Sequence, residues 1–145
     1  MEKLVVDNML DGICTSATGS TLISNCYNCA QVNATAVTNV GYSGGIVGKS
    51  DSTECNITNC YNKGNSNHGG IAGEISSESK ILNNNYYLTE TANVGIYKLG
   101  TNVTDNTIAL NVMPSVLSVI NGDNAFVEDT NNINGGYPIL KWQSK

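Results

Sequence analysis

The sequence has no arginine, and its seven lysines stand against twelve aspartates and glutamates, which gives a net charge of −5 over 145 residues. Proteins that bind nucleic acids or anionic membranes hold phosphate groups with clustered lysine and arginine side chains. Seven lysines are too few, against twelve acidic residues, for such a cluster to be expected. We therefore expect no nucleic acid and no anionic membrane surface among the partners of the chain.

Long hydrophobic runs are also missing. Residues 1–7 contain only a short apolar stretch, whereas a signal peptide needs about 7–15 apolar residues and a membrane-spanning helix about 20. We therefore expect neither a signal peptide nor insertion into a membrane.

Histidine is equally scarce. It occurs once, at position 68, so any catalytic set of serine, histidine and aspartate would have to use it. His68 stands next to Gly69 and Gly70, where a turn is expected, and a solvated loop histidine is the simpler interpretation. On this basis we predict that the chain is not an enzyme.

The five cysteines are an odd number, which excludes a complete set of disulfide bonds. Cys26 and Cys29 have the spacing of half a zinc site, but no second pair of ligands accompanies them. Cys26 and Cys60 occupy the same position in a repeated motif. We expect mostly free, buried thiols that pack like small apolar residues, and no metal or cofactor.

The repeated motif consists of an Asn-Cys-Tyr piece followed by a Gly-Gly-Ile piece. Its three copies are residues 23–28 with 44–48, residues 57–62 with 69–73, and residues 82–87 with 94–96. Gly45, Gly70 and Gly95 are 25 positions apart, and a partial copy stands at Gly12 and Ile13. Fixed spacing of this length predicts a solenoid, in which each repeat forms one coil.

Each unit holds two candidate strands. Gly-Gly-Ile-Val-Gly is too rich in glycine and β-branched residues for a helix interior, and the Asn-Cys-Tyr piece fits a strand that bends at its asparagine. Stacked coils lie about 4.8 Å apart, so equivalent residues form ladders. The predicted ladders are Ile46, Ile71 and Ile96; Ile23, Ile57 and Leu82; and Asn25, Asn59 and Asn84. We predict an all-β fold with a parallel β-solenoid (β-helix) over residues 1–100.

The first full repeat is longer than the others. Tyr27 precedes Gly45 by 18 positions, whereas Tyr61 precedes Gly70 by nine. The nine extra residues fall within 31–42, and insertions of this kind project from a solenoid as loops. We expect features specific to this protein in the loop at 31–42; whether it binds anything stays open.

Residues 101–145 break the period. A helix is predicted over 111–122, with Pro114 at its first position and Gly122 as its stop. A strand at 125–128, a turn at 131–136 and the segment 137–142 follow, and they hold the only phenylalanine and the only tryptophan. Because a solenoid end exposes apolar side chains and unpaired strand edges, we predict a small α/β cap that folds over the final coil and forms a single structural unit with it.

The pair of motifs resembles the GLUG repeat of large bacterial surface proteins, among them adhesin-like proteins and the non-catalytic parts of some immunoglobulin A peptidases. Residues 131–142, Asn-Asn-Ile-Asn-Gly-Gly-Tyr-Pro-Ile-Leu-Lys-Trp, resemble the ending that commonly follows such repeats, so the resemblance covers about residues 12–142. The third copy departs from the pattern, with Asn85 in place of cysteine and Val94 in place of glycine. The resemblance implies a parallel β-solenoid on a bacterial exterior, and it transfers no catalytic residue.

Acidic residues give no sign of a reactive site. Parallel β-helices include glycan-cleaving enzymes that line up carboxylates, but the acidic residues here share no repeat position. These are Asp51, Glu54, Glu74, Glu78 and Glu90. Near the C-terminal end, oxygen ligands for calcium are available, but their spacing does not match an EF-hand and a polar turn is the simpler interpretation. These are Asp123, Glu128, Asp129, Asn131 and Asn134.

The sequence thus predicts a non-enzymatic structural or adhesive module of a bacterial cell-surface or secreted protein. An array that opens on a partial repeat favours a monomeric piece of a larger exported chain, located outside the cell. The expected partner is a host protein or a glycan. Two alternatives stay open: an accessory domain of a secreted peptidase or carbohydrate-active enzyme, and a small glycan-cleaving β-helix.

Overall fold

The computed structural model is mostly β, and its two larger sheets are parallel, which confirms the all-β class. It describes residues 10–34, 42–76, 83–113, 117–121 and 124–145. Several positions singled out in the sequence lie outside this part of the chain: Glu78, Leu82, Pro114, Gly122, Asp123 and residues 35–41 of the predicted loop.

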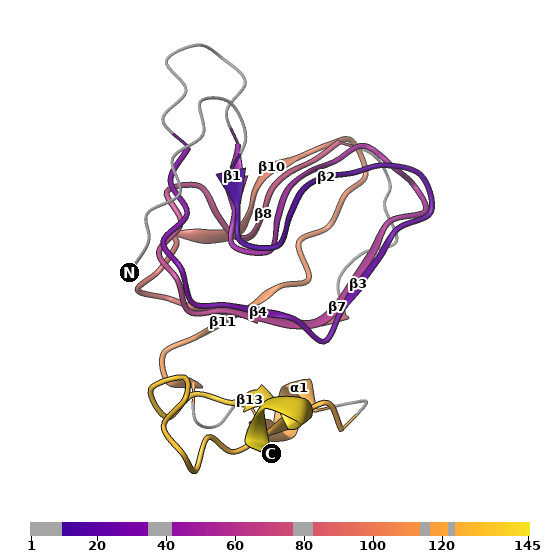
Figure 1. Ribbon diagram of the computed structural model, residues 1–145. Coiled ribbons are helices and arrows are strands. Elements are labelled where there is room, and N and C mark those ends of the chain that lie inside the picture. Colours follow the sequence, from indigo (N-terminus) through magenta and orange to yellow (C-terminus); the bar gives the residue numbers. More distant parts are fainter. Residues whose placement is uncertain (1–9, 35–41, 77–82, 114–116, 122–123) are drawn as a thin grey trace.

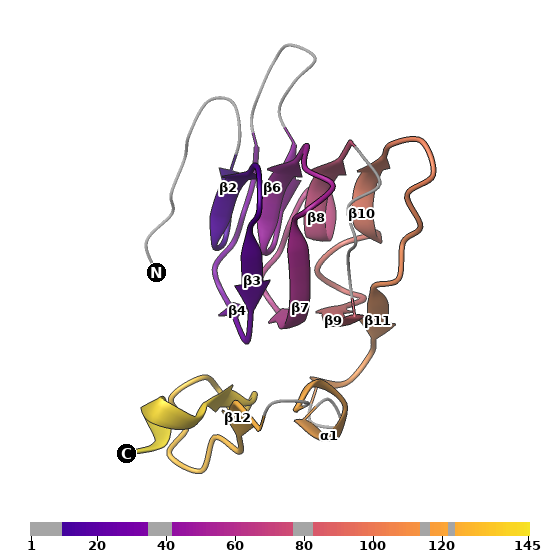
Figure 2. The same cartoon turned by 90° about the vertical axis from the view of Figure 1, so that its right-hand side faces the viewer.

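Two parallel sheets account for most of residues 10–110 (Figures 1 and 2). The first, here called the glycine sheet, has the order β1-β5-β8-β6-β2, and β10 also pairs with β8. Its strands are β1 (Leu10–Asp11), β2 (Cys14–Ala17), β5 (Ser43–Gly44), β6 (Val47–Ser50), β8 (Gly69–Ile75) and β10 (Val94–Leu99). The second, here called the tyrosine sheet, has the order β11-β9-β7-β3, and β4 also pairs with β7. Its strands are β3 (Leu22–Ser24), β4 (Tyr27–Asn28), β7 (Asn56–Asn62), β9 (Asn83–Leu88) and β11 (Ile108–Leu110).

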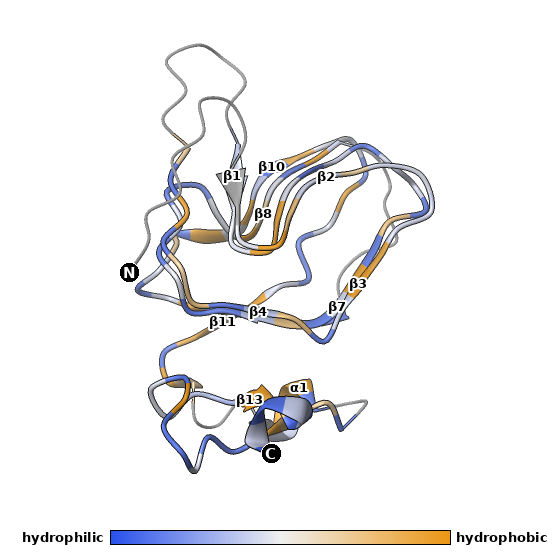
Figure 3. Ribbon diagram, viewed as in Figure 1, coloured by the Kyte–Doolittle hydropathy of each residue, from blue (hydrophilic) through white to orange (hydrophobic). Residues whose placement is uncertain are grey.

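Partner residues in both sheets follow the spacing of the sequence motif. Val47 lies opposite Ala72, and Tyr61 lies opposite Tyr86, each 25 positions further along. Figure 1 looks along the direction in which paired strands follow one another, so that they nearly superimpose, and Figure 2 shows them side by side. Figure 3 shows apolar residues at matching places in superimposed strands. Repetition in the sequence therefore fixes the register of the sheets.

The predicted isoleucine ladder is confirmed for two of its three members. Ile46 and Ile71 are fully buried, and the Ile46 backbone N–H donates to the Ile71 carbonyl oxygen at 3.0 Å. Ile96 is buried in the same apolar cluster, but it lies opposite Ala72 because the register shifts between Val94 and Ile96. Ile96 is thus displaced by one residue from the position opposite Ile71 that the sequence predicts.

A tight bend explains this displacement. An added Cβ at Gly69 would collide with the carbonyl oxygen of Ala72, and one at Gly44 would collide with that of Val47. Only glycine can make so close an approach of backbone to backbone. The third copy has Val94 at the equivalent position, so its chain crosses the bend differently and the register slips.

The asparagine corners are confirmed. Asn25, Asn59 and Asn84 all have left-handed backbone angles, with φ of 53°, 52° and 57°, a region that asparagine tolerates better than most residues. The Asn84 side-chain amide donates to the Asn59 side-chain oxygen at 3.1 Å. Equivalent corners therefore stack, and at least two of them are linked by an amide hydrogen bond.

A second asparagine position explains why the two motifs occur together. The Asn62 side chain is buried; it accepts from the Gly64 N–H at 3.0 Å and donates to the Gly64 carbonyl at 2.8 Å. Asn28 makes the same two bonds with the backbone of Ala30. It also donates to the Asn62 side-chain oxygen at 2.9 Å. An added Cβ at Gly45 would collide with the Asn62 amide. The glycine of one motif therefore makes room for the asparagine of the next.

The insertion in the first repeat is located where the sequence placed it. Asn28 and Asn62, which are partners before the insertion, are 34 positions apart, whereas Ser43 and His68 beyond it are 25 apart. The difference of nine positions arises between Ala34 and Ser43. The residues that would form the loop itself, 35–41, lie outside the described residues.

The C-terminal segment packs on the last repeat, as expected, and also on the repeats before it. After β11, which pairs with β9, it contains α1 (Leu117–Ile120), β12 (Phe126–Val127), β13 (Ile139–Leu140) and the 3-10 helix η2 (Lys141–Ser144), and β12 pairs with β13 in antiparallel fashion. Figure 1 shows these elements beside the face of the tyrosine sheet that points away from the glycine sheet. The predicted helix is described only over α1, and the strand predicted at 125–128 is confirmed as β12.

The contacts of the segment are with tyrosines of several strands rather than with the last strand alone. The Phe126 ring lies 5.6 Å from the Tyr61 ring, and Tyr61 stacks on Tyr27 at 5.2 Å. The Tyr61 hydroxyl donates to the Pro138 carbonyl and accepts from the Asn134 amide at 2.8 Å. A second apolar cluster results, with the buried members Tyr61, Tyr86, Leu88, Met113, Ile120 and Phe126. The segment therefore covers the side of the tyrosine sheet.

Candidate functional site

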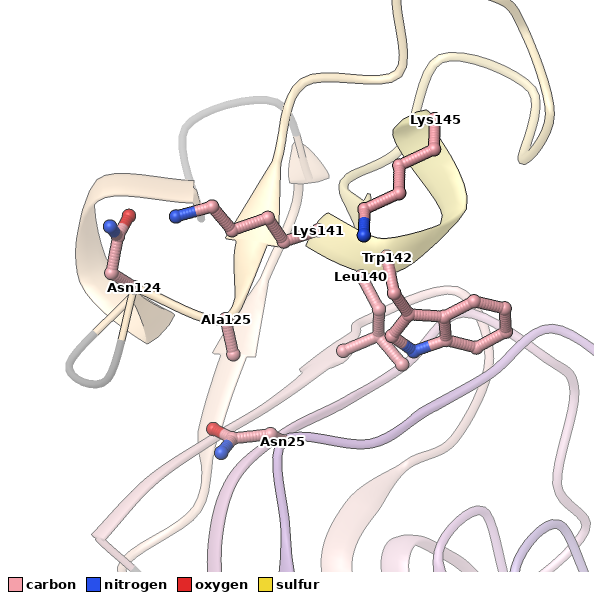
Figure 4. A pocket seen from close by; sticks show the side chains of 7 residues that line it. All are labelled: Asn25, Asn124, Ala125, Leu140, Lys141, Trp142 and Lys145. Atoms are coloured by element: carbon pink, nitrogen blue, oxygen red, sulfur yellow. The ribbon is translucent and has the colours of Figure 1, made fainter.

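A pocket of about 490 Å³ lies between the C-terminal segment and the first asparagine corner (Figure 4). One side is formed by Asn25, which stands between β3 and β4. The other side belongs to two pieces of the C-terminal segment. Its lining residues are Asn25, Asn124, Ala125, Leu140, Lys141, Trp142 and Lys145. The volume falls within the range of small-molecule sites, about 300–1,000 Å³.

Hydrogen bonds hold the Trp142 side of this pocket in place. The Lys141 N–H donates to the Ala125 carbonyl at 2.8 Å, and the Leu140 N–H donates to the Gln143 side-chain oxygen at 2.8 Å. The Gln143 amide in turn donates to the Tyr27 hydroxyl at 3.0 Å. The pocket wall is therefore attached to a residue of β4.

Trp142 is the most conspicuous residue of the pocket. It is the only tryptophan of the chain, and it is 68% exposed although indole is a large apolar group. Figure 4 shows its ring beside Leu140, with the amine of Lys145 on the same side, whereas the Lys141 side chain extends toward Asn124. From the sequence, Trp142 was predicted only to contribute to the apolar core of a cap. Its exposure was not predictable, because it depends on which face of η2 the rest of the chain leaves open.

A second group of side chains surrounds His68. Its ring lies 4.5 Å from the Tyr97 ring and 6.3 Å from the Tyr42 ring, and the Ser43 N–H donates to its Nδ1 at 3.1 Å. Burial lowers the pKa of His68, and a neutral ring is also what the bond to Nδ1 requires. His68 lies in a bend, as expected for a loop histidine, but it is half-buried rather than fully solvated, because neighbouring repeats pack aromatic rings against it.

This arrangement does not make a nucleophile. The Ser43 hydroxyl lies 3.2 Å from His68 Nδ1, but Ser43 is fully buried, and its hydroxyl donates to the Asn67 side-chain oxygen at 2.6 Å. A catalytic serine must reach its substrate. The pair is therefore a structural element of the fold.

Two of the acidic residues that looked scattered in the sequence lie together. Lys49 is 3.2 Å from Asp51 and 3.8 Å from Glu74, and Lys98 is 2.9 Å from Glu74. Lys49 and Lys98 both lie opposite Glu74 in the glycine sheet. This row of charges was not predicted, although the spacing of 25 positions between Lys49 and Glu74 is the spacing of paired residues in neighbouring repeats. Carboxylates neutralised by lysines in this way do not form the paired acid and base of a glycan-cleaving site.

Asp129 forms a polar turn, as the simpler of the two interpretations predicted. Its carboxylate accepts backbone N–H bonds from Ile133, Asn134 and Gly136 at 2.7, 2.6 and 3.0 Å. Burial acts to raise the pKa of Asp129, but these three donors outweigh it and the pKa is lowered. Among the described residues, no group of three or more histidines, cysteines and acidic residues could hold a metal ion.

None of the described cysteines is in a disulfide bond. Cys55 and Cys60 are buried, Cys14 and Cys26 are half-buried, and Cys29 is exposed, so the prediction of mostly buried thiols holds only in part. Cys26 and Cys60 are neighbours, and the hydrogen bond between their thiols lowers the pKa of Cys26 to about 7 and raises that of Cys60. Burial raises the pKa of Cys55.

Thiol titration should separate these cysteines. In the native protein we expect Cys29 and Cys26 to react first and Cys55 and Cys60 to stay protected, because the thiolate is the reactive form and it must be accessible. In denaturant without reductant, all five should react. Cys29→Ser should remove one fast-reacting thiol and leave the others unchanged. A single reactive thiol in the denatured protein would mean two disulfide bonds and would contradict the free state.

Comparison of the chain with protein-family models, with curated proteins and with solved structures finds no match. Within the described residues, no helix has the length and apolar character that crossing a membrane requires. The family resemblance of the repeated motifs therefore stays an expectation that rests on the residues alone.

Proposed function

We propose that the chain is a parallel β-solenoid of GLUG-like repeats and serves as a non-enzymatic structural or adhesive module of a bacterial cell-surface or secreted protein. The observation that carries this proposal is the register of the two sheets. Strands 25 positions apart pair in parallel in both sheets. Equivalent residues lie next to one another, as in the pairs Ile46 and Ile71, Asn59 and Asn84, and Tyr61 and Tyr86. Stacked units of this kind form extended and rigid scaffolds.

The side chains at the repeated positions support a structural role. The Asn28 and Asn62 side chains form hydrogen bonds within their own turns and with each other. The Asn59 and Asn84 side chains are joined by an amide hydrogen bond, and the Tyr27 ring stacks on the Tyr61 ring. Each of these groups is used to hold one repeat against the next. In a scaffold of this type, features specific to one protein lie in segments outside the repeats, and here the described segment of this kind is the C-terminal one that forms the pocket beside Trp142.

An accessory domain of a secreted peptidase or carbohydrate-active enzyme is the second candidate. The pocket beside Trp142 favours a module that binds, and a binding module serves an adhesin and an accessory domain equally well. The full-length reading frame distinguishes the two, because a zinc-binding His-Glu-x-x-His motif or a glycan-cleaving domain beyond this chain would assign it to an enzyme.

The proposed function predicts binding without turnover. The purified protein, coupled to beads, should bind members of a glycan array or an immobilised host matrix protein in a saturable way. The same glycans, incubated with the protein and assayed for new reducing ends, should stay intact. Release of sugar above the level of a heat-denatured control would contradict the non-enzymatic assignment and favour the glycan-cleaving alternative.

A further inference from the structure

The pocket beside Trp142 has an apolar side that suits the C–H face of a sugar ring. Trp142, Leu140 and Ala125 form it, and Trp142 is largely exposed. The face of an aromatic ring carries negative charge density and attracts the polarised C–H groups of a pyranose. An exposed tryptophan in a concave site is also the residue type that most often contributes strongly to binding.

The charge of the pocket is unlike that of the chain. Among the described residues that line it there are two lysines, Lys141 and Lys145, and no acidic side chain, although the chain carries a net charge of −5. The other described lysines are engaged: Lys49 and Lys98 with Glu74, and Lys63 with the Asn134 carbonyl and the Tyr137 ring. Lys141 and Lys145 form no ion pair with any described residue. A local excess of positive charge attracts and selects an anion.

Two asparagines line the pocket from opposite sides. Asn25 and Asn124 each have φ of 53°, so both stand at sharp corners of the backbone. A side-chain amide can both donate and accept hydrogen bonds, and a sugar hydroxyl does the same. The pocket therefore combines an aromatic face, cationic groups and amides.

We propose that this pocket binds a saccharide whose pyranose ring carries a carboxylate, such as a uronic or sialic acid residue. The ring stacks on Trp142, the carboxylate faces Lys141 and Lys145, and the hydroxyl groups meet the amide of Asn124 and the amide nitrogen of Asn25, whose side-chain oxygen is buried. This inference rests on the adhesive function proposed above, since it names the class of glycan that the module holds.

Fluorescence offers a direct test, because Trp142 is the only tryptophan and its emission reports on this pocket alone. We expect a saturable change in emission with sialyllactose and with trigalacturonic acid. Lactose, which lacks the acidic residue, and the methyl ester of trigalacturonic acid, which lacks the charge, should bind about tenfold more weakly or not at all. Equal binding of the neutral probes, or binding of a sulfated disaccharide with none of the carboxylated probes, would overturn the proposal.

Variants separate the two kinds of contact when binding is followed by calorimetry. Trp142→Ala should lower the affinity for acidic probes about tenfold or more. Lys141→Gln should reduce the preference for the acid over its neutral counterpart. Lys49→Gln removes the same charge at a distant place in the glycine sheet and should change neither. Circular dichroism confirms that each variant is folded. Unchanged affinity in folded Trp142→Ala would overturn the assignment of the pocket.

A glycan array probed with the wild-type chain and with Trp142→Ala distinguishes an error in the assignment of the pocket from an error in the proposed adhesive function. If Trp142→Ala loses the acidic glycans that the wild-type chain binds, both stand. If the two proteins bind the same glycans equally well, the adhesive function stands and the pocket is not its site. If the wild-type chain binds another protein through Trp142 and no acidic glycan, the pocket is a protein-docking surface and the inference is wrong.

Discussion

Replacing Ile71 with alanine is expected to lower the free energy of unfolding by about 2–5 kcal/mol. Ile71 is fully buried in the middle of the glycine sheet, next to the equally buried Ile46. Strands on both sides pack against β8, so the surroundings cannot collapse into the space left by the missing carbons. Thermal or urea unfolding, followed by circular dichroism, measures the effect.

Two control variants make this prediction specific. Ile71→Val removes one methylene group and should cost about 0.5–1.5 kcal/mol. Leu22→Ala shortens a side chain that is 68% exposed and should change stability by less than about 0.5 kcal/mol. If Ile71→Ala were no worse than Leu22→Ala, the ladder of buried isoleucines and the solenoid proposed from it would be wrong.

The spacing of the motif was enough to predict which strands pair. Side chains at the same position of each repeat meet the same environment, so a 25-position period translates directly into a parallel register. The asparagine corners were predictable for a further reason. Few residues besides glycine tolerate a positive φ, and the motif has asparagine rather than glycine where the strand must bend.

Details that depend on close approach of backbone atoms were harder to predict. The sequence shows that Val94 replaces a glycine, but it does not show that Gly69 bends against the Ala72 carbonyl and that a Cβ has no room there. The slipped position of Ile96 follows from that bend. The buried role of Asn85 was equally hidden: its side chain accepts from the Cys60 N–H at 3.1 Å and donates to the Ile57 carbonyl at 2.8 Å. The asparagine that departs from the motif at this position therefore adds hydrogen bonds between β9 and β7.

The candidate site could not be predicted at all, because its parts are far apart in the sequence. Asn25 belongs to the first repeat and Trp142 to the end of the chain. The repeated motif predicts the backbone bend at Asn25, and Trp142 stands out only as the single tryptophan of the chain. Their meeting depends on the path of the C-terminal segment back along the tyrosine sheet (Figure 2), for which the sequence carries no periodic signal.

That path makes the C-terminal segment part of the stability of the repeats, and removal of residues 112–145 is expected to make the remaining chain unfold or aggregate. The truncation strips Phe126 from Tyr61 and uncovers Tyr86 and Leu88. It also leaves the Tyr61 hydroxyl without the Asn134 amide and the Pro138 carbonyl. Loss of the Phe126 side chain alone corresponds to about 3–5 kcal/mol, a large share of the stability of a small domain.

Size-exclusion chromatography with light scattering, and the melting midpoint, measure this effect, and point variants of the full chain refine it. Phe126→Ala should lower the midpoint strongly, whereas Ile133→Ala, at a side chain that is 49% exposed, should leave it nearly unchanged. Because sheet and segment bury one another, the emission of Trp142 and the circular dichroism of the strands should report one coincident transition. A monomeric 1–111 fragment with an unchanged midpoint would show that the segment contributes nothing to the fold, and its contacts with the tyrosines would then serve only to position the pocket beside Trp142.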